Sequence, residues 1–362
     1  MGRIEDSIMQ RITMSERKNR GQGFSKGWRW CHACALAAGL GAGALMGSAQ
    51  AAQTLVLGHG AAPGNPRALA AEHMAELVNE YSKGELELTI QGSEQLGSDL
   101  QMLQQVQSGA LGLSANSQGA LANIVPKANV FGLPFLFDSP QAAWQVVDGE
   151  IGDEVAEQAE QRGFKVLAWW DNGLRQFTNN VRPITSPSDM KGLKMRTPQD
   201  PVTIDTLRAL GANPTPLAFG ELYVALKQGT VDGQENPVVN IVSSHLEEVQ
   251  KYLSLSDYRY ETTPVVIGLV SWQRLSREHQ EVLMKAARES TDFERQTLIS
   301  QTDELLKKLR SDKSIAINDV DTQAFRQATA SVDETWQGKL GDIVSRAREA
   351  AKSANAQHQG AN

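Results

Sequence analysis

Apolar and polar positions alternate along the chain in blocks that predict strands and helices in turn. The blocks read as strands are short, rich in β-branched or apolar side chains, and end at turn-forming residues. The helical blocks have apolar positions on one face and begin at residues such as Pro66 and Ser98, which suit a helix start. This alternation is typical of an α/β layered fold. The first third of the chain is predicted to form strands at 54–57, 86–90 and 111–113 and helices at 66–82 and 99–107.

The pattern continues through the middle of the chain. Asn172-Gly173 is a turn signal, which places Arg175 just past a turn, where we expect the chain to leave one domain for another. Residues 130–137 are apolar with an internal proline and are expected to form a buried loop edge. The other predicted elements are helices at 141–161 (broken near Gly149), 201–210 and 218–228, strands at 165–170, 193–196, 253–260 and 263–271, and an extended segment at 213–216.

The last third of the chain is predicted to be mainly helical. A chain of 362 residues is long enough for two domains. Residues 277–313 have a helical pattern that is long for a globular protein, so we expect this helix to span both domains. A second long helix is expected over 321–353, after a strand at 315–317. Residues 355–362 are expected to form a disordered tail.

The N-terminus has the pattern of a secretory signal peptide. A basic lead precedes an apolar run over 33–46, and Ala49-Gln50-Ala51 gives a small-x-small cleavage pattern. Cleavage after this site predicts a signal peptide over 1–51, with translation starting at Met1, Met9 or Met14. The alternative is an uncleaved membrane anchor, but the apolar run is shorter than the roughly 20 residues that span a bilayer.

Charge and cysteine content exclude several classes of function. The net charge is −7, and removal of 1–51, with seven Lys/Arg and three Asp/Glu, gives −11 for the mature chain. We therefore expect no nucleic-acid partner. Both cysteines, Cys31 and Cys34, lie in the removed segment, so their C-x-x-C spacing predicts neither a redox centre nor a metal site. A cysteine-free mature chain suits an oxidising compartment.

Two polar segments follow predicted strands of the first domain. Ligands of open α/β sheets bind at the carboxyl ends of the strands. His59 follows the first strand and the loop over 116–118, with Asn116 and Ser117, follows the third, so both are candidate pocket residues. The structural alternative for His59 is that it caps a helix or satisfies a turn.

Arginines on either side of the predicted domain connection are candidates for binding a carboxylate. Arginine is permanently charged and planar, and it donates two parallel hydrogen bonds to a carboxylate. Arg196 ends a predicted strand, and Arg175 lies on the other side of the connector. Asn236 can donate its amide to the same carboxylate or cap a helix. On spacing alone, surface ion pairs worth about 0–1 kcal/mol each are the simpler explanation of both arginines.

Several motifs in order strongly resemble the periplasmic solute receptors of tripartite ATP-independent (TRAP) transporters, and above all their C4-dicarboxylate-binding type. The resemblance covers nearly all of Gln53 to about Leu340. The matching stretches are QLGSD at 95–99, RQFTNN at 175–180, GLKMRTP at 192–198, ALGANPTP at 209–216, ELY at 221–223 and VDGQENP at 231–237.

The resemblance implies two α/β lobes that close on a ligand about a hinge, with a long helix that bridges them. We place lobe I at 52–172 plus 262–301 and lobe II at 173–261 plus 302–354. The resemblance further implies that Arg196 binds the substrate carboxylate. It also implies that Arg175 is the second arginine of the site, and that Asn236 is the amide beside it. Phe219 falls where relatives place an aromatic ring against the ligand, and Asp99 resembles an acidic residue that acts near polar groups of sugar acids. Sialic-acid-binding relatives carry a glutamate in the loop over 116–118, which is uncharged here, so a sialic acid is not expected.

The sequence therefore predicts a periplasmic receptor that captures an organic acid anion, either a C4-dicarboxylate or a sugar acid. It would deliver this ligand, as a monomer and without any cofactor, to TRAP permease subunits driven by an ion gradient. One alternative is a receptor that presents the acid to a membrane sensor. A receptor for an ATP-driven transporter is disfavoured by the Arg196 and Glu235-Asn236-Pro237 blocks. An exported enzyme is disfavoured because the histidines are scattered and neither H-E-x-x-H nor a nucleophile elbow is present.

Overall fold

The computed structural model describes residues 52–359. The predicted signal peptide and residues 360–362 lie outside this range. Within residues 52–359, no helix combines the length and the apolar character needed to cross a membrane.

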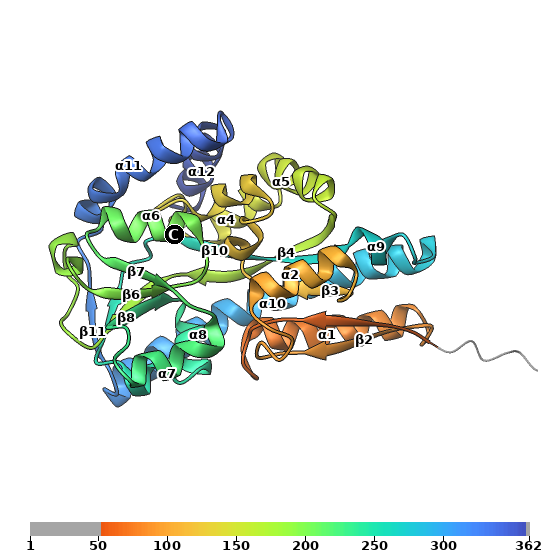
Figure 1. Ribbon diagram of the computed structural model, residues 1–362, viewed down its shortest axis with the longest axis horizontal. Helices are drawn as coiled ribbons and strands as arrows, with labels where there is room; N and C mark the ends of the chain where they lie inside the picture. Colours follow the sequence, from red (N-terminus) through yellow and green to blue (C-terminus); the bar gives the residue numbers. More distant parts are fainter. Residues whose placement is uncertain (1–51, 360–362) are drawn as a thin grey trace, which may run out of the picture. The chain divides into compact units, whose positions relative to one another are not determined.

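The first of two separate sheets is the centre of lobe I (Figure 1). Its strands are β1 (Gln53–Gly58), β2 (Leu86–Gln91), β3 (Leu113–Ala115), β4 (Phe164–Leu174) and β10 (Tyr260–Gly268). They lie in the order β2-β1-β3-β10-β4. β1 pairs in parallel with β2 and β3, whereas β10 runs antiparallel to β3 and β4. The carboxyl ends of the parallel strands therefore share one edge, where the segments after β1 and β3 lie.

The second sheet is the centre of lobe II. Its strands are β5 (Gln176–Asn179), β6 (Lys194–Thr197), β7 (Asn213–Pro216), β8 (Gly233–Asn236), β9 (Tyr252–Leu255) and β11 (Ala316–Asp319). They lie in the order β11-β9-β5-β8-β6-β7. The two prolines of β7, Pro214 and Pro216, fit this edge position, because proline cannot donate to a further strand. β8 lies between β5 and β6, so its side chains are buried.

Helices cover the sheet of lobe I and end where the sequence places capping residues. Asn65 and Ser98 accept backbone hydrogen bonds at the starts of the first two helices, and Gly109 ends the second with φ +79°. These helices are α1 (Pro66–Tyr81), α2 (Asp99–Ser108), α3 (Gln118–Leu121), η1 (Pro126–Gly132), α4 (Pro140–Val147), α5 (Glu150–Gln161) and α9 (Leu269–Trp272). The expected buried loop over 130–137 is buried, although part of it is the 3-10 helix η1.

The helices of lobe II are shorter. They are η2 (Pro187–Met190), α6 (Pro201–Ala209), η3 (Phe219–Glu221), α7 (Leu222–Lys227), α8 (Val238–Ser243) and η4 (Leu246–Val249). The single helix predicted at 218–228 is thus divided into η3 and α7.

One long helix, α10 (Arg277–Asp312), belongs to both lobes. Its first half contributes Leu283 and Ala287 to the core that includes α1 and the first sheet. Its last turns contribute Leu309 to the core that includes α7 and α8. In Figure 1 it runs from beside α1 toward α7 and α8. The prediction of a long helix that spans both lobes is confirmed.

The C-terminal helices differ from the prediction. The helix expected over 321–353 is two helices, α11 (Thr322–Leu340) and α12 (Ile343–Gln359), because Gly341 at φ +75° interrupts it. α11 packs against α6, but α12 packs against α4 and α5, which belong to lobe I (Figure 1). The expected lobe II range 302–354 is therefore shared between the lobes. Residues 355–359, expected in a disordered tail, form the last turns of α12.

Three strands near the lobe connection, the long strand β4 and the short strands β5 and β8, also differ from the prediction. The Asn172-Gly173 pair was predicted as a turn, but it lies inside β4, at an irregularity in the pairing with β10 where Gly173 has φ +99°. β5 and β8 were not predicted, because their mixed polar sequences have no apolar alternation. Both strands carry buried polar side chains, and Asn236 of β8 lines a cavity described below.

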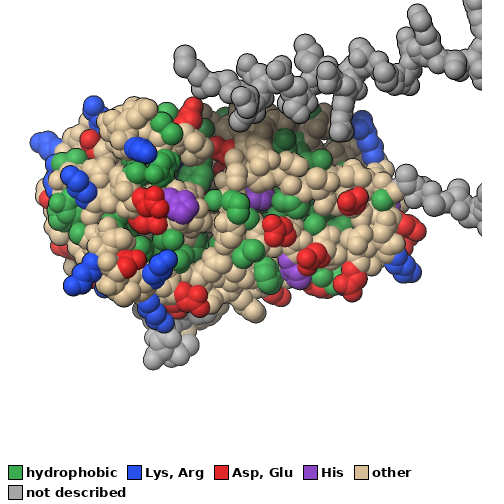
Figure 2. Space-filling view, turned by 90° about the horizontal axis from the view of Figure 1, so that it is seen from below, with side chains coloured by type: hydrophobic (Ala, Val, Ile, Leu, Met, Phe, Trp, Pro, Cys, Tyr) green, Lys and Arg blue, Asp and Glu red, His purple; other side chains and the backbone are tan. Residues whose placement is uncertain are grey.

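Acidic and basic side chains are interspersed over the visible face in Figure 2. On this face, the described residues form no continuous basic surface of the kind that binds nucleic acid.

Candidate ligand-binding site

A cavity between the two lobes has about 460 Å³ of empty space, part of which is open to solvent. Lobe I contributes the segment between β1 and α1, and lobe II contributes β6, η3 and α8. Six of the eight predicted site residues line it: Arg196, Arg175, Asn236, Phe219, Asp99 and Ser117.

Arg196 is held at the end of β6 and is 2% exposed. Its Nε and Nη2 donate to the backbone oxygen of Leu217 at 3.1 and 2.8 Å. Among the described residues it has no salt bridge to a carboxylate and no hydrogen bond from Nη1. Arg196 is therefore a buried cation with unused donor capacity on a cavity wall.

Burial sets the electrostatics of Arg196. Loss of water lowers the pKa of Arg196 to about 10, although the carboxylate of Glu235 opposes this effect. The guanidinium is still charged at neutral pH, but its charge costs free energy while no anion is beside it. Its Cζ lies 5.7 Å from the ring centroid of Phe219, a half-buried residue of η3 that faces the same cavity.

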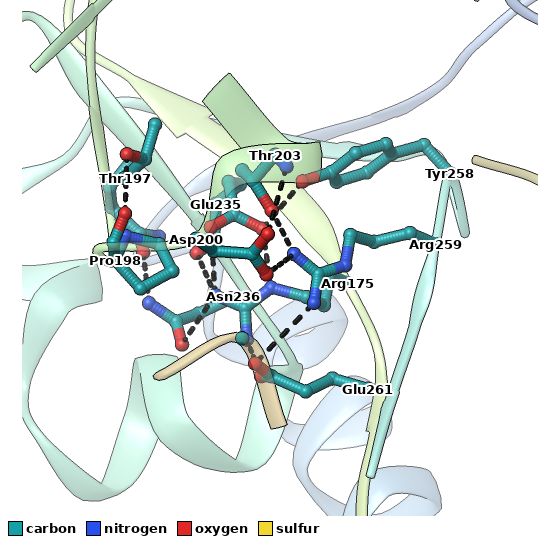
Figure 3. Close-up of polar contacts among 12 residues, drawn as sticks. Arg175, Thr197, Pro198, Asp200, Thr203, Glu235, Asn236, Tyr258, Arg259 and Glu261 are labelled. Atoms are coloured by element: carbon teal, nitrogen blue, oxygen red, sulfur yellow. Dashed lines mark hydrogen bonds and ion pairs between the residues drawn. The ribbon is translucent and has the colours of Figure 1, made fainter. Parts of the chain in front are cut away.

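Arg175 is in a different situation, because two protein carboxylates already bind it. It lies between β4 and β5, and its guanidinium forms ion pairs with Glu235 and Glu261 (Figure 3). Its Nη2 also donates to the Oδ1 of Asn236 at 3.2 Å. Burial opposes the charge, but the two carboxylates outweigh it and raise the pKa of Arg175. The sequence led us to expect a ligand carboxylate between the two arginines. Such a carboxylate would find Arg175 already bound to two carboxylates of the protein.

A second buried arginine extends this network. Arg259 Nη1 donates to Asp200 Oδ2 at 2.6 Å, and its Nη2 lies 3.5 Å from Glu261 Oε1 (Figure 3). Burial works against ionised Glu261, but Arg175 and Arg259 together hold the pKa of Glu261 at about 2. Sequence reasoning missed Arg259 and Glu261. Their signal was present as charged residues at the start of an otherwise apolar strand pattern.

Amide side chains connect the two lobes beside this network. Asn236 Oδ1 accepts from Asn240 Nδ2 at 3.2 Å. Asn240 also donates to Asn172 Oδ1 at 3.1 Å and accepts from Asn65 Nδ2 at 2.8 Å. Asn65 lies at the start of α1 and Asn240 on α8, so hydrogen bonds cross from one lobe to the other at the cavity. Of these four asparagines, only Asn236 was predicted.

Asp99 and Ser117 meet on the lobe I side of the cavity. Asp99 Oδ2 accepts from the backbone amide of Ser117 at 3.1 Å. Its other oxygen, Oδ1, is buried and has no hydrogen-bond partner among the described residues. Burial raises the pKa of Asp99, while the charge of Arg67 opposes that rise. Asp99 thus offers an unsatisfied acceptor to the cavity.

His59 and Asn116 are buried beside the cavity but do not line it. His59 Nδ1 accepts from the backbone amide of Ala61 at 3.2 Å, as in the structural alternative. Burial and the charge of Arg67 lower the pKa of His59 to about 4, so the ring is neutral at pH 7. In the part of the chain that the structure describes, no group of three or more His, Cys, Asp or Glu side chains is placed to hold a metal ion.

Comparison with known proteins gives the family of this architecture. Residues 57–339 match the model of bacterial extracellular solute-binding protein family 7, DctP. The chain belongs to this family. The predicted resemblance to TRAP solute receptors and the predicted two-lobed α/β fold are confirmed. The family also confirms that the chain is a binding protein rather than an enzyme.

Two curated relatives and one solved structure show how far the family likeness extends. A protein of Sinorhizobium fredii is 45% identical over 81% of this chain, which spans 54% of that relative's length. The 2,3-diketo-L-gulonate-binding periplasmic protein YiaO of Escherichia coli is 34% identical over 80% of this chain and 88% of its own length. The sugar acid binding protein DctPAm of Advenella mimigardefordensis, in complex with galactonate, is 32% identical, with a TM-score of 0.81 and coverage of 84% of this chain and 99% of that one.

Proposed function

We propose that this chain is a periplasmic receptor that captures a hydroxylated organic acid anion and delivers it to a TRAP permease. The observation that carries the proposal is Arg196, a buried guanidinium on a wall of the cavity between the lobes with no carboxylate partner among the described residues. A ligand carboxylate at Arg196 would offset the cost of burying that charge.

The chemistry of the other wall supports a sugar acid over a plain dicarboxylate. Asp99 Oδ1 is a buried acceptor without a donor, and a ligand hydroxyl would satisfy it. The relative YiaO is named for binding 2,3-diketo-L-gulonate, and the sugar acid binding protein DctPAm was solved in complex with galactonate; both are acids of this kind. The uncharged loop with Asn116 and Ser117 is the feature that disfavours sialic acid.

Contacts between the lobes support a mechanism of capture by closure. Asn65 on α1 bonds to Asn240 on α8, and Glu94 after β2 accepts from the backbone amide of Gly220 in η3 at 2.6 Å. These bonds form only when the lobes are together, so closing would surround the ligand and exclude water. Such a receptor needs no cofactor, and we propose that it acts as a monomer toward its permease.

The test of this function is thermal unfolding of residues 52–362 against a panel of sugar acids, dicarboxylates, keto acids and aromatic acids. A ligand at about 100 times its dissociation constant stabilises the folded protein by about 2.7 kcal/mol. We expect a raised unfolding temperature with one or a few sugar acids. If none of the acids shifts the transition, and mass spectrometry of the denatured protein reveals no retained acid, the proposed function is wrong.

The competing proposal is a receptor that presents the acid to a membrane sensor. Reconstitution with the permease separates the two proposals, because only a transport receptor makes uptake of the labelled acid into vesicles depend on its presence.

A further inference from the structure

Arg67, the second residue of α1, was not among the predicted site residues, yet it lines the cavity from lobe I. Its side chain is 6% exposed. Among the described residues its guanidinium forms no hydrogen bond and no salt bridge, and its Nε is enclosed without a partner. Its backbone amide donates to the Oδ1 of Asn65.

The other buried arginines all have partners. Arg175 and Arg259 bind protein carboxylates, and Arg295 binds Asp148. Arg196 donates twice to the backbone oxygen of Leu217. Arg67 is therefore the buried cation whose donors are least used, and burying such a group without a partner costs free energy. In a binding protein, a ligand is the natural partner.

The surroundings of Arg67 indicate what that partner is. The side chain extends from the first turn of α1, where the helix dipole favours an electron-rich group. Asp99 lines the same cavity and has an unsatisfied buried acceptor, Oδ1. Arg67 can only donate and ionised Asp99 can only accept. A hydroxylated chain satisfies both, because each hydroxyl accepts one hydrogen bond and donates another.

We propose that Arg67 forms a second recognition subsite, which binds an oxygen at the end of the ligand opposite the carboxylate held by Arg196. Arg67 is on lobe I and Arg196 is on lobe II, so one ligand that reaches both would link the lobes. The subsite selects an acid with a polar far end over an acid of the same length with an aliphatic one. This inference rests on the proposed function and specifies its ligand class.

The test compares two probes of equal chain length in Arg67→Met and wild-type protein. Galactonate carries oxygens along its whole chain, whereas 2-hydroxyhexanoate keeps the carboxylate end and lacks the far oxygens. Calorimetry gives both dissociation constants, and their ratio measures recognition of the far end. We expect Arg67→Met to reduce the wild-type preference for galactonate at least tenfold, and Arg67→Lys to restore part of it. Arg162→Met, at an exposed arginine of lobe I, should leave the ratio unchanged.

Other outcomes separate the two proposals. If the wild type binds neither probe nor any acid of the panel, the proposed function fails, and the inference fails with it. If the wild type binds acids but Arg67→Met weakens both probes equally, or weakens neither, the receptor function stands and the second subsite is wrong. If apo Arg67→Met loses cooperative unfolding, Arg67 is structural, which also overturns the inference.

Discussion

At the scale of single residues, the site contains arginines in three different states. Arg175 is neutralised by Glu235 and Glu261, Arg196 is held by a backbone oxygen, and Arg67 has no partner among the described residues. The partners that each arginine already has in the protein decide which arginine is available to a ligand. Sequence could predict that arginines matter here, but it could not predict their partners, because Glu261 lies 86 residues from Arg175.

The first prediction contrasts Arg175 with Arg196 in the absence of ligand. Arg175→Met leaves two buried carboxylates without their cation and should lower the free energy of unfolding by about 3–5 kcal/mol. Arg196 forms no salt bridge with a carboxylate of the described residues, so Arg196→Met should change the free energy of unfolding far less. Urea denaturation of both variants checks this, with Arg175→Lys as an intermediate case. Equal destabilisation by the two methionine variants would show that Arg196 also has a structural role.

The second prediction concerns a buried carboxyl pair, in which Glu294 Oε2 accepts from the backbone amide of Asp171. Burial raises the pKa of Asp171 from 3.8 to about 6, against hydrogen bonds from Trp144 and Gly173. Burial and the charge of Asp171 also raise the pKa of Glu294. Between about pH 4 and 6 the folded protein thus binds more protons than the unfolded chain. The protonated carboxyl groups therefore contribute fully to the stability of the folded protein below about pH 4. This contribution is lost as the pH rises through 6.

Glu294→Gln removes one carboxyl of this pair, so the variant should gain stability relative to the wild type as the pH rises from 4.5 to 7. The slope per extra bound proton is at most about 1.4 kcal/mol per pH unit. Urea denaturation across this range measures it, with Glu304→Gln, an exposed position on the same helix, as the control. A difference from wild type that is independent of pH would contradict the assignment.

At the scale of elements, sequence patterns predicted the apolar strands, the capped helices and β6 with Arg196, but not the polar strands β5 and β8. β1, α1, α2 and α10 were predicted almost to their ends, because capping residues and apolar periodicity mark them. β5 and β8 carry buried polar side chains that find partners only in the folded protein, as where Gln234 of β8 donates to Thr178 of β5. The break at Gly341 and the packing of α12 on lobe I depend on tertiary contacts that one sequence does not reveal.

The third prediction concerns the contact between the loop after β2 and η3. The bond from the amide of Gly220 to the carboxylate of Glu94 joins lobe I to lobe II. A hydrogen bond to a charged group contributes about 1.5–3 kcal/mol when well formed. Glu94→Ala should therefore speed ligand dissociation roughly tenfold, with a smaller effect on association. Stopped-flow measurement of the dissociation rate tests this, with Glu87→Ala, exposed on β2, as the control. An unchanged dissociation rate would mean that this contact does not hold the lobes together.

At the scale of the whole molecule, the family likeness and the geometry describe a receptor whose lobes meet over a small polar cavity. Lobe II supplies Arg196 and lobe I supplies Asp99 and Arg67, so neither lobe alone presents a complete site. The sequence led to the correct family because its motifs match in order along most of the chain. It could not give the ligand, because the ligand is set by donors and acceptors that come together only across the two lobes.

The most direct test of this account is calorimetric titration of Arg196→Ala and Arg196→Lys with the acid that the thermal panel identifies. We predict that Arg196→Ala lowers affinity at least about 30-fold, which corresponds to roughly 2 kcal/mol. Its apo unfolding should be unchanged, and Arg208→Ala, on the exposed side of α6, should bind as wild type. Arg196→Lys should also bind poorly, since an ammonium group cannot reproduce two parallel hydrogen bonds. Wild-type affinity in Arg196→Ala would contradict the central claim that this guanidinium holds the carboxylate of the ligand.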